Sequence, residues 1–406
     1  MRVLVAIASF LLIVVVLWDA FETIVLPRRV TRRLRLTSFY YRVTWQPWLM
    51  LTRLIRSHKR REMSLSIYGP LSLLALIALW AVGLVFGFGM LNWATGTPLN
   101  IPPQAATFST YLYMSGVVFF TLGFGDVTPV DGLGRLLTVL QSGMGFGVLA
   151  IVIGYLPVLY GAFSRREINV ALLDARAGSP PSAVELLCRH AHAECLDNLE
   201  GLLADWERWS AELLESHLSY PVLSYYRSQH NNQSWLAALV VILDACALVL
   251  TTLSGTTGRS RWQAQLTFTM SRHALVDIVQ VFDAASEFKR LREHGDAIKD
   301  RLPASALDAL QRTLEAGSIP VERTASSEHH LAELRASYEP FAVALADYLL
   351  MPLPVWNPDT KHSDNWQTSK WTRPVARDAV LDSAYENRDG ATPEQTGDAS
   401  TEEHAW

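Results

Sequence analysis

A stretch of 63 consecutive residues, from Met63 to Gly125, contains no Asp, Glu, Lys, Arg or His. About a quarter of the residues in an ordinary soluble domain are charged, against 18% for this chain as a whole. A helix crosses a hydrocarbon core of about 30 Å with about 20 apolar residues. The uncharged run therefore predicts an integral membrane protein and excludes a fully soluble fold.

Three apolar segments are long enough to span a bilayer as helices: Val3–Leu26, Ile67–Leu91 and Leu136–Phe163. The first has the position of a secretory signal peptide. However, Arg2 is the only charge before it, and no Ala-x-Ala cleavage site follows. We interpret this segment as a retained transmembrane helix.

The loop charges predict the orientation of the three spans. Residues 27–62, after the first span, are rich in arginine, whereas residues 92–106, after the second, have no charge. Arg165 and Arg166 follow the third span. Because short loops rich in Lys and Arg stay in the cytoplasm, we expect the N-terminus outside and the C-terminus inside.

Aromatic and basic residues are mixed in the loop after the first span, where Trp45 and Trp48 lie between Arg42 and Arg53. Indoles and arginines are typical of a helix in the lipid headgroup plane. A basic loop that only sets the topology explains the same charges. The sequence leaves both interpretations open.

Residues 107–125 are uncharged but too short to cross the membrane twice. Irregular backbone at membrane depth is stable only where protein buries it or where it lines water. We therefore predict a re-entrant segment, with a helix from Phe108 to about Phe119 and a return strand over 121–125.

The end of this segment resembles a known motif. The residues Thr121-Leu122-Gly123-Phe124-Gly125-Asp126 are similar to the selectivity filter of potassium channels, Thr-Val-Gly-Tyr-Gly-Asp. Together with the flanking spans they resemble the pore of two-transmembrane bacterial potassium channels. The resemblance implies a homotetramer in a bacterial inner membrane, in which backbone carbonyls replace the water around K⁺.

The resemblance also implies a role for each filter residue. Glycine at 123 and 125 permits the backbone angles that turn successive carbonyls to one side. Thr121 adds a hydroxyl at the inner end, while Leu122 and Phe124 wedge the strand against the surrounding helices. Asp126 lies at the outer mouth, where it concentrates cations, or it caps the turn before Pro129.

The motif departs from the family at several positions. Phe124 lacks the hydroxyl by which tyrosine ties the filter to the pore helix, and Leu122 replaces the usual valine. Phe120 stands where threonine is frequent, and Val117 where some members have a carboxylate. A filter held more by packing than by hydrogen bonds keeps a weakly selective cation channel open as an alternative.

The third span contains the expected gating elements. Gly145 lies near the hinge glycine of the family, and Pro157 removes a backbone donor and predicts a kink at the inner mouth. Small residues also allow close helix packing, which explains Gly145 equally well. Gln141 and Ser142 are expected to face the central cavity. No span has arginine at every third position, which argues against voltage sensing.

Asp19 and Glu22 lie at the inner end of the first span. Carboxylates at membrane depth are functional candidates. Their closeness to Arg28 favours ion pairs at the interface over a role in conduction.

The remaining residues predict a cytoplasmic α-helical domain over 165–351 and a disordered acidic tail over 352–406. Ser182 and Glu185 form a capping-box pattern, and later helical patterns include 326–351. Residues 235–253 are apolar enough for a fourth span. Asp244 at their centre favours a buried helix of the bundle instead.

Cys188, His192 and Cys195 have spacings that place them on one helical face, where thiolate and imidazole suit Zn²⁺. A single helix rarely supplies three ligands, and buried cysteine is an ordinary apolar residue. We therefore predict no metal and no cofactor, with K⁺ as the permeant ion.

The whole sequence thus predicts an all-α membrane protein with five parts: an N-terminal helix (1–26), a basic segment (27–62), a potassium-channel pore (63–164), the helical domain and the tail. No nucleotide-binding, nucleic-acid-binding or catalytic motif is present, so we expect neither an enzyme nor a nucleic-acid partner. The favoured function is a K⁺ channel gated through the helical domain by an unknown ligand or protein. A membrane-anchored receptor or scaffold with a vestigial pore is the alternative from another class.

Overall fold

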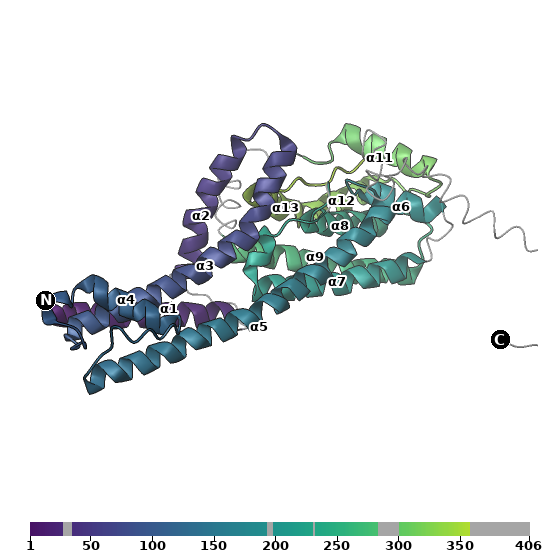
Figure 1. Cartoon of the computed structure of the whole chain (residues 1–406). Coiled ribbons are helices and arrows are strands. Elements are labelled where there is room, and N and C mark those ends of the chain that lie inside the picture. The colour runs from purple at the N-terminus through teal and green to yellow at the C-terminus, as the bar shows by residue number, and fades with distance from the viewer. Residues whose placement is uncertain (27–34, 193–197, 230–231, 283–299, 358–406) are drawn as a thin grey trace, which may run out of the picture.

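The computed structural model describes residues 1–26, 35–192, 198–229, 232–282 and 300–357. It is helical almost throughout, and the extended pairings in those ranges are two isolated bridges, Leu99 with Pro129 and Leu253 with Val321. A narrow part at one end contains the N-terminus, and a wider helical bundle lies at the other (Figure 1). Two long helices connect the parts. This confirms an all-α membrane protein.

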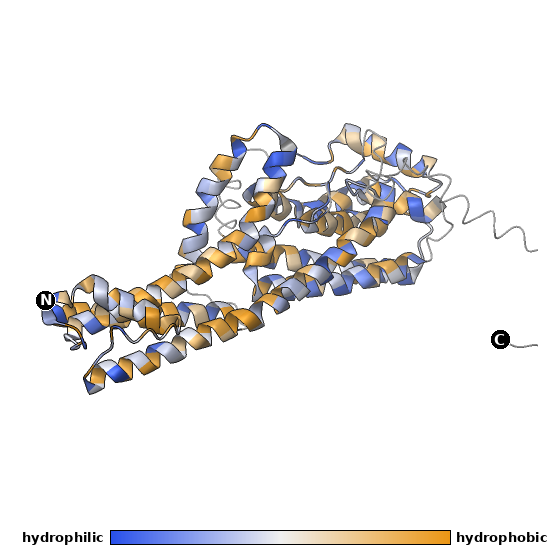
Figure 2. Cartoon of the chain, viewed as in Figure 1, coloured by the Kyte–Doolittle hydropathy of each residue, from blue (hydrophilic) through white to orange (hydrophobic). Residues whose placement is uncertain are grey.

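The narrow part contains four helices, α1 (Arg2–Ile24), the second half of α3 (His58–Thr95), α4 (Phe108–Phe119) and the first half of α5 (Gly132–Ala177). Apolar residues predominate on these helices (Figure 2). Three of these helices, α1, α3 and α5, are long and apolar enough to cross a membrane. The number of spans agrees with the sequence prediction.

Helix α1 packs along α3 through a pair of glycines. A Cβ atom on Gly87 would lie 2.7 Å from the side chain of Ile13, and one on Gly83 would lie 3.1 Å from that of Val16. Glycines four residues apart form a smooth groove on one helix face, and transmembrane helices use such grooves for close contact. Helix α1 is therefore packed closely against α3 in the narrow part.

The wider part is a bundle around α8 (Trp235–Thr251), in which every residue from Trp235 to Val249 is buried. Around it lie α6 (Ala183–His192), α7 (Leu199–Ser219), α9 (Gly258–Val281) and the short helices near the C-terminus. Those short helices are α11 (Ala304–Ala316), α12 (Ala325–Ala336) and α13 (Glu339–Leu349). Because protein surrounds α8 on all sides, it is a core helix and not a fourth span.

Helix α2 (Leu36–Arg53) packs its two tryptophans against the protein. Trp45 is buried in the bundle core, and its indole N–H donates to the Tyr348 carbonyl oxygen at 3.1 Å. The indole of Trp48 donates to the carbonyl of Ser64 in α3 at 3.3 Å. The aromatic residues that suggested an interfacial helix thus fix α2 to α3 and to the bundle.

The helices run across the boundaries expected from the sequence. Helix α3 begins at His58, and α5 continues to Ala177 as one element of 46 residues. Residues 352–357, assigned to the acidic tail, pack on the bundle, where Trp356 is buried between Arg301 and Arg335. Residues 358–406 lie outside the described ranges.

Candidate functional site

The segment that resembles a filter is held by a short helix with the predicted bounds, α4. Ser115 on this helix donates to the Val85 carbonyl of α3 at 2.6 Å, and the Gln141 amide of α5 donates to the Ser115 hydroxyl at 2.6 Å and to its carbonyl at 2.9 Å. Gln141 is buried and does not face a cavity, in contrast to the sequence expectation. One serine thus joins the outer, pore and inner helices.

The backbone after α4 alternates in handedness. Thr121, Gly123 and Gly125 have φ angles of +54°, +65° and +76°, whereas the residues between them do not have positive φ. L-residues avoid this left-handed region, and glycine enters it without a Cβ penalty. An alternation of left- and right-handed residues turns successive carbonyl groups toward one side of the strand, as an ion-binding column of oxygens requires.

The filter side chains make few contacts within one chain. Leu122 and Phe124 are 55% and 65% exposed, and no atom lies within 4 Å of a Cβ built on Gly123 or Gly125. The packing expected of Leu122 and Phe124 is therefore not supplied by this chain's own helices. It remains a prediction for an assembly.

Asp126 follows the filter on the exposed side, and the hydroxyl of Tyr113 on α4 donates to its carboxylate at 2.9 Å. Tyr113 was not among the residues predicted from the sequence. The predicted lack of a tyrosine bond concerned Phe124 within the filter, whereas Tyr113 lies on α4 and bonds to the residue after the filter. The signal was the spacing, because Tyr113 lies two helical turns before the end of α4 and points to the mouth. Asn100 and Thr128 fix the loop that follows the filter. The backbone N–H of Asn100 donates to the Thr128 carbonyl at 3.0 Å.

Gly145 lies close to the end of the pore helix. A Cβ atom there would lie 2.1 Å from the backbone oxygen of Phe119, at the last turn of α4. Helix α5 continues unbroken through Gly145 and through Pro157. The structure therefore supplies a packing reason for Gly145, and the hinge role of Gly145 and Pro157 remains a prediction.

Gly145→Ala is expected to destabilise the pore part by about 1–3 kcal/mol or more, because a methyl group must displace backbone rather than a flexible side chain. Gly143→Ala is the matched control, since nothing lies within 4 Å of a Cβ at that position. Thermal unfolding of the purified proteins in detergent measures both. A Gly145→Ala variant as stable as the wild type would contradict the close approach.

The two carboxylates of α1 have different partners. Asp19 is buried and accepts from the Thr37 hydroxyl at 2.6 Å, from the Thr37 N–H at 3.1 Å and from the Trp80 indole at 3.0 Å. Glu22 lies 3.7 Å from Arg35. Arg28, the ion-pair partner expected from the sequence, lies outside the described residues. Asp19 thus joins α1, α2 and α3 through neutral donors.

The metal-site pattern falls partly outside the described residues, because Cys195 and the side chain of His192 are not among them. The thiol of Cys188 points to the Thr313 carbonyl of α11 at 3.8 Å. Within the described ranges, no group of three His, Cys, Asp or Glu side chains is arranged to hold a metal ion.

The filter segment lies within a match to a known protein family. Residues 74–159 match the ion channel family. The matched range begins in α3, contains α4 and the filter segment, and ends in α5 after Pro157. The part of this chain that contains the filter is therefore similar to the pore domains of ion channels, a family that is not one of enzymes.

A curated relative supports the membrane assignment. The chain is 25% identical over 188 residues to a protein of Bacillus subtilis (strain 168) named "Uncharacterized membrane protein YdjJ". The match covers 45% of this chain and 54% of the relative, so the chain spans about half the length of that protein. No solved structure matches the chain.

Proposed function

We propose that this chain forms a potassium-selective channel, a homotetramer in a bacterial inner membrane with the N-terminus outside and the bundle in the cytoplasm. The observation that supports it most is the alternation of positive φ at Thr121, Gly123 and Gly125, directly after a pore helix. Four such strands around one axis form rings of carbonyl oxygens that replace the hydration shell of K⁺.

The exposure of the filter side chains favours an assembly of several copies. Leu122 and Phe124 are largely exposed in one chain, and apolar residues of α5 such as Phe146 and Leu149 are exposed on the same helix that carries the gate. In a ring of four chains, neighbouring helices cover these side chains and supply the wall that a filter strand needs.

The direct test is the reversal potential of the full-length protein in planar bilayers under opposing K⁺ and Na⁺ gradients. A potassium channel gives a reversal potential close to the K⁺ equilibrium potential, and the large cation N-methylglucamine serves as the impermeant control. A reversal potential near zero supports the weakly selective cation channel. Absence of current together with a non-tetrameric mass contradicts the channel and favours a receptor or scaffold.

The bundle is the proposed regulator of the gate. Its support is the continuity of α5, which begins beside the filter and ends at Ala177 within the bundle. A change in the bundle therefore acts on the inner helix without an intervening flexible linker.

A further inference from the structure

A short segment, Tyr220–Ser228, lies between the outer and inner helices where they leave the membrane part; we name it the bridging segment. It contains the 3₁₀ turn η3 (Pro221–Tyr225). On the α3 side, a Cβ on Gly69 would lie 2.7 Å from the ring of Tyr226. On the α5 side, the ring of Tyr220 lies 5.5 Å from that of Tyr155. The segment therefore separates the two helices that line and surround the pore.

One buried arginine fixes this segment to the inner helix. Arg166 of α5 donates to the carbonyls of Leu223 and Tyr226, both at 2.9 Å, and is only 3% exposed. Its guanidinium lies 5.2 Å from the centre of the Phe163 ring. Hydrogen bonds from a charged donor are stronger than neutral ones, and a buried guanidinium that loses its acceptors is costly. These two hydrogen bonds therefore hold the bridging segment against α5, and we call them the clamp.

The Glu167 carboxylate, which lies 3.0 Å from the Arg166 guanidinium, and a neutral histidine complete the clamp. The Nδ1–H of His217 donates to the Leu213 carbonyl at 2.8 Å, which leaves Nε2 as an acceptor 3.3 Å from Arg166. Burial, and then the nearby Arg166 charge, lower the pKa of His217 well below its ordinary value. The imidazole thus stays uncharged beside the guanidinium.

The bridging segment also contacts the far side of the bundle. The ring of Tyr225 stacks on that of Tyr41 in α2, with centroids 5.3 Å apart, and its hydroxyl lies 3.1 Å from that of Tyr348 in α13. Arg227 donates to the Leu350 carbonyl at 3.2 Å. Helices α2, α3, α5 and α13 therefore meet at these nine residues.

From this geometry we infer that the bridging segment is the mechanical coupler of the channel, through which a ligand or partner on the bundle moves the inner helix relative to the outer helix. Arg166 is a positioning residue that holds the bridging segment against the inner helix. On the opposite side of the segment, Tyr226 contacts Gly69 of the outer helix. The inference rests on the proposed channel function and adds the route by which the bundle regulates the gate.

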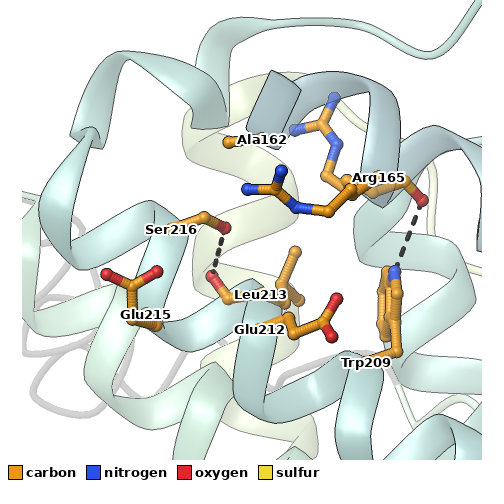
Figure 3. A pocket seen from close by; sticks show the side chains of 8 residues that line it. Ala162, Arg165, Trp209, Glu212, Leu213, Glu215 and Ser216 are labelled. Atoms are coloured by element: carbon orange, nitrogen blue, oxygen red, sulfur yellow. Dashed lines mark hydrogen bonds between the residues drawn. The ribbon is translucent and has the colours of Figure 1, made fainter. Parts of the chain in front are cut away.

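The neighbouring residue supplies a matched control. Arg165 has the same charge and lies beside the same membrane boundary, but it is exposed. Both arginines line a pocket between α5 and α7, together with Glu212, Glu215 and Ser216 (Figure 3). Removing either arginine takes one positive charge from the end of the third span, so both variants change the charge signal for its orientation equally. Of these two side chains, Arg166 is the one that donates hydrogen bonds to the bridging segment.

The test compares Arg166→Gln with Arg165→Gln in the full-length protein in planar bilayers. We expect Arg166→Gln to change the open probability by about fivefold or more, while the K⁺/Na⁺ reversal potential and unit conductance stay unchanged. Arg165→Gln is expected to behave as the wild type. An open probability unchanged in Arg166→Gln, in a channel that conducts, overturns the coupler and leaves the channel function standing.

A second variant acts from the opposite side of the segment. Gly69→Ala pushes against Tyr226 and is expected to change the open probability, whereas Gly154→Ala, which meets nothing within 4 Å, is not. The effects of Gly69→Ala and Arg166→Gln are expected to be non-additive, because both act through the same residues.

If Arg166→Gln does not assemble, Gly69→Ala decides the test. Additive effects overturn the coupler, and absence of wild-type current overturns both proposals.

Discussion

Gly123→Ala is expected to abolish K⁺ flux through the reconstituted protein. Gly123 has a φ of +65°, and an L-residue in the left-handed region costs about 1–2 kcal/mol. In a ring of four chains the cost adds to at least about 4 kcal/mol, because every strand must keep the conducting conformation. At about 1.4 kcal/mol per factor of ten, the conducting population falls about a thousandfold.

The measurement is K⁺ uptake into liposomes that contain purified wild type or variant at equal protein content. Gly116→Ala is the control, since that glycine lies in the pore helix and a Cβ there meets its first neighbour at 3.9 Å. No atom of the chain lies within 4 Å of a Cβ at Gly123, so the loss comes from backbone conformation and not from a clash within the chain. Undiminished flux in Gly123→Ala would contradict the filter.

Asp244→Asn is expected to destabilise the bundle by about 3–5 kcal/mol, the usual cost of removing one partner from a buried ion pair. Asp244 lies at the centre of α8 and is bonded to both terminal nitrogens of Arg301, at 2.7 and 3.2 Å, and to the Tyr338 hydroxyl. Burial disfavours the charge of Arg301, but Asp244 and its neighbours outweigh burial and raise the pKa of that arginine. In the variant, the buried positive charge of Arg301 loses the negative charge of Asp244.

Thermal unfolding of the full-length protein, followed by circular dichroism, measures this effect. The control is Asp308→Asn, which breaks an exposed ion pair with Arg323 and is expected to cost less than about 1 kcal/mol. Equal melting temperatures for Asp244→Asn and Asp308→Asn would show that the buried pair does not stabilise the bundle.

The pore was the most predictable part of the fold, because its signals are local. The uncharged run indicates which residues lie in the membrane, and the glycine pattern at 123 and 125 directly follows an apolar segment of helix length. The predicted helix over 108–119 has the bounds of α4. Helix α8 was also predictable, since one carboxylate in an apolar helix argues for a protein interior.

Contacts between distant residues were not predictable. Gln141 looked like a cavity residue because polar side chains on an inner helix face water, but its partner Ser115 lies 26 residues earlier and is brought there only by the fold. Trp45 looked interfacial for a similar reason, and its acceptor, Tyr348, is 303 residues away. A side chain's polarity indicates that it needs a partner and does not identify that partner.

One local signal was overlooked. The expected helix over 326–351 is two helices, α12 and α13, which are separated by Ser337 and Tyr338. Pro340 marks the break, because proline is favoured in the first turn of a helix. The break turns the Tyr338 hydroxyl inward to Asp244.

The buried carboxylate of α1 also constrains how the protein is made. The Trp80 indole that satisfies Asp19 is 61 residues later in the chain. Ribosomes add about 5–20 residues per second, so this donor emerges about 3–12 seconds after Asp19. During that interval the nascent first helix enters the translocon with an acid that lacks its tryptophan partner. The hydrogen bonds of Asp19 are therefore complete only after the helix from which Trp80 projects has been made.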